Sequence, residues 1–172
     1  FFENNNAIKS IWTYGNRNPQ GLAMHPASSI LFETEHGPRG GDELNILSSG
    51  KNYGWPEITY GKNYSGTTIT KYTHKEGMEQ PVIHWTPSIA VCGIDFYDGK
   101  LFNNWKNNLL VSSLKFERLY RLEIDDDDKV IDQEIIYEAG SRIRDVQTGP
   151  EGFIYIALED PGRIVRFIPI KN

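Results

Sequence analysis

Short stretches in which apolar and polar residues alternate run along most of the chain, and turn-forming residues separate them. In residues 118–124, RLYRLEI, the apolar Tyr120, Leu122 and Ile124 alternate with polar residues. Such alternation predicts a half-buried β-strand. By the same pattern, or by a short apolar run, we predict strands over 7–14, 21–24, 30–34, 43–47, 82–85, 94–97, 108–114, 130–137, 142–147, 153–158 and 163–168. No segment shows a convincing helical period, so the predicted fold class is all-β.

Turn-forming residues mark where these strands reverse. Asp98-Gly99 and the segment 149–152, GPEG, predict hairpin turns, and the acidic run 125–128 predicts a solvated hairpin tip. Residues 57–80 are polar and lack apolar periodicity. We therefore expect them to form a long excursion over the surface.

Two hairpins share an internal echo. Ile30 and Glu35 follow Pro26 at the same spacing at which Ile154 and Glu159 follow Pro150. The distance between the copies would hold about two four-stranded repeat units, and repeated four-stranded sheets are typical of a β-propeller. A chain of 172 residues holds roughly three such sheets, fewer than the four to eight that close a ring. The sequence thus predicts one domain over 1–172, an incomplete propeller of about three blades.

Composition excludes several classes of protein. The net charge is −5 without a basic stripe, which argues against a nucleic-acid partner. No apolar run is long enough to span a membrane. The only cysteine, Cys92, excludes an internal disulfide and is expected to be a small buried side chain. The chain opens without a methionine or a signal peptide, so we expect a fragment or a processed product.

The stretch 33–56 is the candidate for chemistry. Gly37-Pro38 and Gly40-Gly41 suit neither a helix nor a strand interior. They leave backbone carbonyls free beside acidic side chains, and oxygen donors of this kind are what calcium prefers. The alternative is a plain glycine-rich connection between strands.

Four segments together resemble the soluble quinoprotein sugar dehydrogenases, the glucose/sorbosone and aldose sugar dehydrogenase family. They are 15–21, GNRNPQG; 35–45, EHGPRGGDELN, with 52–56, NYGWP; 113–115, SLK; and 142–146, RIRDV, with 149–152, GPEG. Their order and spacing match across nearly the whole chain. The resemblance implies a six-bladed propeller that binds pyrroloquinoline quinone (PQQ) and calcium and oxidises the C1 hydroxyl of aldoses.

The resemblance also assigns roles to particular residues. It implies PQQ binding by Arg17, Asn18, Lys115, Arg142 and Arg144. It implies that the carbonyls of Gly37 and Pro38 hold the catalytic calcium, that Glu43 and Tyr53 belong to a second, structural calcium site, and that Trp85 lies at the substrate mouth, where the alternative is a core tryptophan. PQQ carries three carboxylates, which suits the planar fork of arginine and the point charge of lysine.

One expected part is missing. In the family the general base is a histidine beside an aspartate, upstream of the segment around Arg17, so the chain contains no predicted catalytic residue and should be inactive alone. An alternative is a non-catalytic propeller of the same descent that binds carbohydrate or protein, and a third is a β-sandwich with a calcium loop. The expected partners are an aldose, an electron acceptor that the sequence does not identify, and either the missing half-propeller or a second copy of this chain. The resemblance places the protein in the periplasm or outside the cell.

Overall fold

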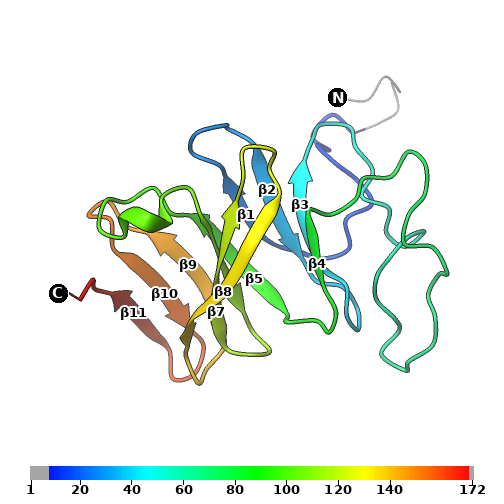
Figure 1. The fold of residues 1–172 in the computed structure, drawn as a ribbon. Helices are drawn as coiled ribbons and strands as arrows, with labels where there is room; N and C mark the ends of the chain where they lie inside the picture. Colours follow the sequence, from blue (N-terminus) through cyan, green and yellow to red (C-terminus); the bar gives the residue numbers. More distant parts are fainter. Residues whose placement is uncertain (1–7, 171–172) are drawn as a thin grey trace.

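The computed structural model describes residues 8–170. Its strands form three antiparallel sheets that follow one another along the chain (Figure 1). The first sheet contains β1 (Pro19–Met24), β2 (Leu31–Glu35), β3 (Asp42–Leu47) and β4 (Ile83–Trp85); the second contains β5 (Val91–Phe96), β6 (Leu109–Ser113), β7 (Arg118–Ile124) and β8 (Val130–Glu138); the third contains β9 (Ile143–Thr148), β10 (Ile154–Leu158) and β11 (Arg163–Phe167). The prediction of an all-β fold is confirmed.

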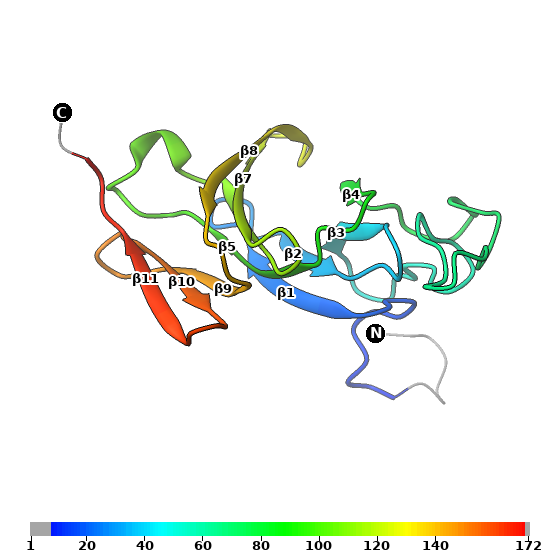
Figure 2. The ribbon, with the colours of Figure 1, turned by 90° about the horizontal axis from the view of Figure 1, so that it is seen from below.

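The first strands of the three sheets are neighbours. β5 packs against both β1 and β9 (Figure 2), although these strands belong to different sheets. Each sheet therefore starts at a common inner side and continues outward through antiparallel neighbours, which is how the blades of a propeller are arranged. The loops that precede β1 and β9 consequently reach the same inner region.

Two hydrophobic cores lie between the sheets. Phe32 and Leu44 from the first sheet pack with Phe96 and Leu109 from the second, and Leu110 on the opposite face of β6 packs against Ile154 of the third. β6 of the middle sheet is thus covered on both faces, and all its residues, LLVSS, are buried. Cys92 is a free, buried residue, as expected.

The internal echo marks equivalent positions of two sheets. Pro26 lies in the turn between β1 and β2, and Pro150 lies in the turn between β9 and β10. Glu35 ends β2, and Glu159 directly follows β10. The repeated spacing therefore reflects a repeated sheet, with one sheet between the copies.

Two local predictions were wrong. The pattern in 7–14 predicted a strand, but within the described residues 8–14 only Tyr14 forms a bridge, with Asn52. Alternation indicates an amphipathic segment, but this one makes only a few backbone hydrogen bonds with residues 50–53 and forms no ladder. Asp98-Gly99 is not a tight hairpin turn either, because the connection from β5 to β6 continues through a 3-10 helix at Asn103–Trp105.

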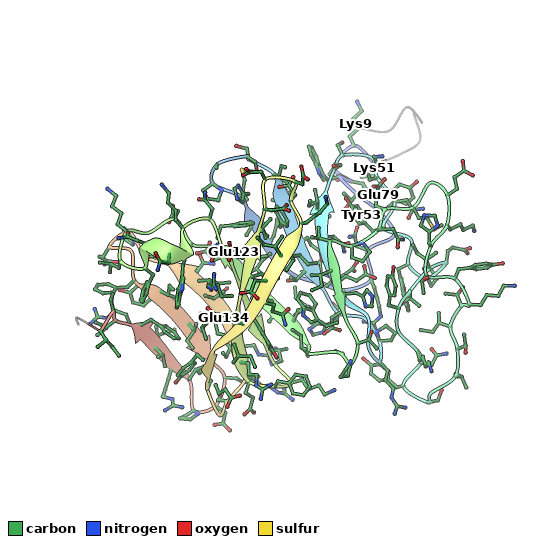
Figure 3. The ribbon with its side chains drawn as sticks, in the orientation of Figure 1. Lys9, Lys51, Tyr53, Glu79, Glu123 and Glu134 are labelled. Carbon is green, nitrogen blue, oxygen red and sulfur yellow. The ribbon has the colours of Figure 1, made fainter. Side chains whose placement is uncertain are left out.

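The polar excursion is confirmed. Residues 57–80 form no strand and extend away from the first sheet (Figure 1). The C-terminal end of this excursion is held beside the segment that precedes it, where Lys51 pairs with Glu79 at 3.0 Å, close to Tyr53 (Figure 3). The backbone N–H of Glu79 also donates to the carbonyl of Asn52 at 2.8 Å. The excursion thus starts and ends beside the candidate loop.

Candidate functional site

The glycine-rich loop joins β2 to β3, and a buried aspartate holds its shape. One oxygen of the Asp42 carboxylate accepts from the Gly37 N–H at 3.1 Å, and the other accepts from the Val91 N–H at 3.3 Å. Both oxygens accept from the Ser88 hydroxyl at 2.8 Å. Asp42 therefore ties the loop to the segment that leads into the second sheet.

Only glycine fits at the centre of this loop. A Cβ atom at Gly37 would lie 2.2 Å from the carbonyl oxygen of Gly40 and 2.3 Å from that of Gly41. Real Cβ atoms do not approach backbone oxygens so closely. The close approach gathers several carbonyl oxygens, the donors that a hard cation prefers.

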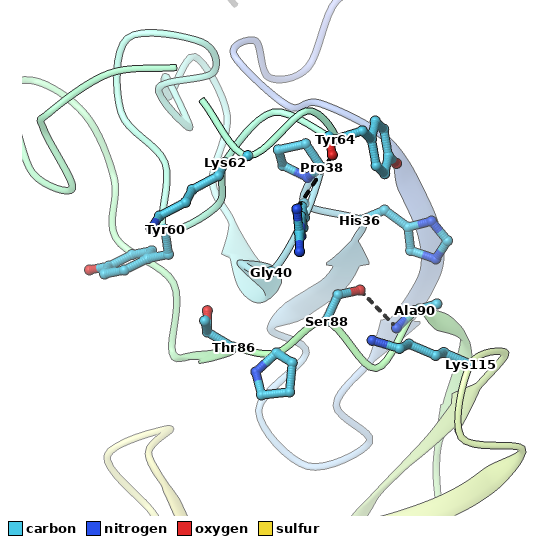
Figure 4. A pocket seen from close by; sticks show the side chains of 14 residues that line it. His36, Pro38, Gly40, Tyr60, Lys62, Tyr64, Thr86, Ser88, Ala90 and Lys115 are labelled. Atoms are coloured by element: carbon cyan, nitrogen blue, oxygen red, sulfur yellow. Dashed lines mark hydrogen bonds between the residues drawn. The ribbon is translucent and has the colours of Figure 1, made fainter. Parts of the chain in front are cut away.

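A pocket of about 930 Å³ opens beside the loop (Figure 4). Its lining residues include Gly37, Pro38, Thr86 and Ser88. Arg39, Lys62 and Lys115 also line it, whereas none of the aspartates and glutamates within residues 8–170 does. The pocket is therefore positively charged, although the chain as a whole carries −5. Such a site favours an anionic ligand.

Arg17 lies behind the loop and contacts its carbonyls. The Nη1 group donates to the carbonyl of His36 at 2.7 Å and to that of Gly37 at 3.2 Å. The guanidinium also stacks over the Trp55 ring, 5.2 Å from its centroid. The Gly37 carbonyl thus accepts from a guanidinium already, which leaves its second lone pair for the predicted cation.

His36 contacts Asn18 beside the first sheet and Val91 at the start of the second sheet. The Asn18 amide Nδ2 lies 3.5 Å from Nδ1 of His36, and Nε2 of His36 contacts the carbonyl of Val91. A ring whose Nε2–H donates to a carbonyl leaves Nδ1 to accept from the amide. His36 is therefore a packed loop residue whose ring nitrogens both have partners.

Buried carboxylates support the loop from the outer face of the first sheet. The Asn45 Nδ2 group donates to Glu33, Glu35 and Glu43 at 3.3, 3.2 and 3.4 Å. Two N–H bonds cannot fully satisfy three carboxylates, and the other atoms Glu33 Oε1 and Asn45 Oδ1 are buried without a partner. The array is therefore short of protons or positive charge.

Burial raises the pKa values of all three carboxyls, Glu33, Glu35 and Glu43. Burial raises the pKa of Glu33 to about 9, and the charge of Glu35 adds to the rise. Burial, followed by the charge of Glu35, raises the pKa of Glu43 to about 7. Burial also raises the pKa of Glu35, although the backbone N–H groups of Arg17 and Asn18 donate to it and oppose the rise.

Glu43 and Tyr53 share a small cavity of about 10 Å³. Glu35, Gly37 and Arg17 also line this cavity, which has the size that one water molecule needs. The Tyr53 hydroxyl donates to the carbonyl of Ile46 at 2.6 Å. Within residues 8–170, no group of three or more His, Cys, Asp or Glu side chains is arranged to hold a metal ion. A cation here would therefore depend on backbone carbonyls as well as carboxylates.

Arg142 and Arg144 share one partner. Nη2 of Arg144 lies 2.7 Å from Oε2 of Glu159, and Nη1 of Arg142 lies 3.7 Å from the same atom. The two arginines alternate across Ile143 at the start of β9, as residues two apart on one side of a strand do. Arg142 lines a separate pocket with Glu159 and does not line the pocket beside the loop.

Trp85 packs in the hydrophobic core, which was the alternative to a place at the substrate mouth. Its ring is 7% exposed within the first hydrophobic core. The indole N–H donates to the side-chain carbonyl of Gln133 at 2.9 Å. Trp85 does not line the pocket, and the aromatic rings that do belong to Tyr60 and Tyr64.

The structure thus brings together part of the predicted set. Gly37, Pro38 and Lys115 line one pocket, and Arg17, Glu43 and Tyr53 meet behind it. Sequence reasoning missed the residues that hold this set in place: Asp42, Asn45, Glu35 and Glu159. Glu35 and Glu159 carried a signal, since both belong to the internal echo.

Comparisons with known proteins agree with this geometry. The family model for glucose/sorbosone dehydrogenases matches residues 1–166. The chain belongs to the glucose/sorbosone dehydrogenase family. The curated aldose sugar dehydrogenase YliI of Escherichia coli is 44% identical over 98% of this chain and 46% of its own length. The quinoprotein glucose dehydrogenase B of Acinetobacter calcoaceticus is 28% identical over 91% of this chain and 44% of its own length.

Solved structures of this family superpose well. The apo-form of the soluble aldose sugar dehydrogenase from E. coli has a TM-score of 0.91 at 44% identity. The match covers 96% of this chain and 49% of the chain in that structure. The PQQ-bound aldose sugar dehydrogenase from Streptomyces coelicolor has a TM-score of 0.68 at 27% identity. That match covers 91% of this chain and 44% of the chain in the solved structure. The chain therefore spans about half the length of the family members that it matches. Within residues 8–170 no helix could cross a membrane.

Proposed function

We propose that this chain forms the cofactor-binding part of a PQQ- and calcium-dependent dehydrogenase, which oxidises the C1 hydroxyl of aldose sugars to lactones. The observation that supports this proposal most directly is the pocket between the Gly37-Pro38 loop and Lys115. The Lys115 ammonium lines it, and none of the described carboxylates does. A tricarboxylate needs fixed positive charge, and calcium needs oxygen donors.

Different residues of the chain would bind calcium and PQQ. The carbonyls of Gly37 and Pro38 would hold calcium, and Arg17 would bind PQQ and polarise its quinone together with calcium. Lys115, Asn18, Arg142 and Arg144 would bind the carboxylates and ring oxygens of PQQ. The chemistry that bound PQQ and calcium supply is the acceptance of two electrons at a polarised quinone.

Glu159 is a positioning residue in this proposal. It holds Arg142 and Arg144 through a single carboxylate oxygen, so both guanidinium groups stay on one side of β9. Because all three side chains are partly exposed, the pairs are weak. An incoming carboxylate can therefore share or replace them.

The general base is expected outside this chain. His36 lines the pocket, but its ring lies between Asn18 and Val91. His84 is stacked on Tyr60, with ring centroids 3.8 Å apart. Transfer of a hydride from C1 requires removal of the hydroxyl proton, so the chain alone should bind the cofactor without turnover. Export to the periplasm or beyond the cell is inferred from the family resemblance.

Calorimetric titration of the chain with PQQ, with and without calcium, tests the proposal. We expect calcium-dependent binding that Arg144→Ala weakens about tenfold, because one charge-assisted pair is lost. Arg163→Ala is the matched control, since Arg163 lies on β11 and is exposed. Binding that ignores calcium, or that both substitutions weaken equally, would contradict the proposed site.

A further inference from the structure

Two cations on one wall of the pocket have no role in cofactor binding as proposed. The Arg39 N–H donates to the Lys62 carbonyl at 3.1 Å, and the Lys62 N–H donates to the Arg39 carbonyl at 3.2 Å. This is an isolated antiparallel bridge. Residues paired in this way project their side chains from the same side of the backbone. The side chains of Arg39 and Lys62 therefore leave neighbouring backbone positions and bring two cations to one part of the pocket lining.

The charges of this pair have no compensating carboxylate in the part of the chain that the structure describes. Among the described residues, no carboxylate lies within 4 Å of the charged groups of Arg39 or Lys62. Arg39 makes only a long contact to the Tyr64 carbonyl, at 3.5 Å. Like charges placed directly opposite each other destabilise a strand pair. An arrangement that costs stability at the mouth of a pocket is typical of a binding site.

The surroundings of this pair suit a sugar. Lys62 and Lys115 lie on opposite sides of the pocket (Figure 4). Tyr60 and Tyr64 flank Lys62 and offer aromatic faces, and stacking on His84 at an interplanar angle of 10° holds the Tyr60 ring. The hydroxyls of Thr86 and Ser88 lie on the pocket wall between the two lysines (Figure 4).

We propose that Arg39 and Lys62 bind the anionic group of an acidic aldose, a sugar with a carboxylate or phosphate remote from C1. This inference rests on the proposed function, in which the cofactor occupies the Lys115 side and C1 of the sugar faces it. Arginine binds such a group through its planar fork, and lysine adds a point charge. The pair then selects acidic sugars over neutral ones.

Binding of three probes to the chain tests this selection directly: glucose, glucuronate and glucose 6-phosphate, each with and without PQQ and calcium. We expect at least one acidic sugar to bind about tenfold more tightly than glucose. Arg39→Gln combined with Lys62→Gln should remove that difference. Lys71→Gln, on the same excursion but outside the pocket lining, should keep it. Glucuronate and glucose 6-phosphate separate a carboxylate preference from a phosphate preference.

Each outcome bears on one of the two proposals. Equal affinity, or no binding, for all three sugars would overturn the acidic-aldose site. So would a loss of PQQ affinity in the double variant, because the pair would then bind the cofactor. Acidic-sugar selection in a chain that does not bind PQQ would support the sugar site and reject the proposed function.

Discussion

At the scale of single residues, the buried carboxylates on the outer face of the first sheet are the most unusual feature. Glu33 is 2% exposed and has an oxygen without a partner. Its side chain faces Asn45 and the neighbouring Glu35 and Glu43. A buried negative charge is costly unless a cation or a proton compensates it. This array therefore makes the stability of the chain depend on pH.

We predict that Glu33→Gln stabilises the chain at alkaline pH. The pKa of Glu33 is raised to about 9, so the folded state binds this proton more tightly than the unfolded chain does. The contribution of Glu33 to stability is full below its unfolded pKa and is lost as pH rises toward 9. At pH 8 the variant should gain on the order of 2 kcal/mol in unfolding free energy, with no gain at pH 4.

Urea unfolding at both pH values, in the presence of a calcium chelator, measures this effect. Glu76→Gln is the control, because Glu76 is exposed on the excursion. Equal destabilisation of Glu33→Gln at pH 4 and pH 8 would show that the carboxylate is needed for packing or hydrogen bonding, independently of its ionisation.

At the scale of elements, the loop from β2 to β3 depends on a backbone approach that only glycine allows. We predict that Gly37→Ala costs about 2 kcal/mol or more, because the added Cβ would overlap two carbonyl oxygens. Thermal unfolding should show a fall in Tm of about 4–8 °C for a chain of this length.

Gly162→Ala is the matched control for this change. A Cβ at Gly162 meets nothing within 4 Å, so its Tm should stay close to that of the parent chain. An unchanged Tm for Gly37→Ala would mean that the loop can open without cost, and the carbonyls would then not be held ready for a cation.

Strands were predictable because they show local patterns, whereas the site depends on long-range contacts. The interval 118–124 coincides with β7, since alternation matches a sheet with two environments. Segment 7–14 alternates too, but its described part forms no strand, because pairing is not encoded locally. Asp42 reaches Val91 and Ser88 across two sheets. Such a role requires the fold, whereas the Gly37-Pro38 loop was recognisable from its composition alone.

At the scale of the whole molecule, both end sheets expose apolar side chains. Leu22 and Met24 on β1 are 61% and 60% exposed, and Ile164 on β11 is 69% exposed. In the middle sheet, the strands β5 and β6 are covered on both faces, whereas the outer strand β8 is mostly exposed. Family members are about twice as long as this chain, so an outer face of each end sheet is available for a further sheet to pack against. We propose the other half of a propeller, or a second copy of this chain, as the partner.

We predict that the chain associates through these faces. Burial of one leucine or methionine side chain contributes roughly 1.5–3 kcal/mol, so Leu22→Glu with Met24→Glu should raise the dissociation constant at least tenfold. Sedimentation equilibrium over a range of concentrations measures the change. Tyr72→Glu is the control, because Tyr72 is exposed on the excursion, far along the chain from β1. A parent chain that stays monomeric at 100 µM (roughly 100-fold above a micromolar Kd) would contradict association with a second copy. The apolar faces of β1 and β11 would then be tolerated in water without a partner.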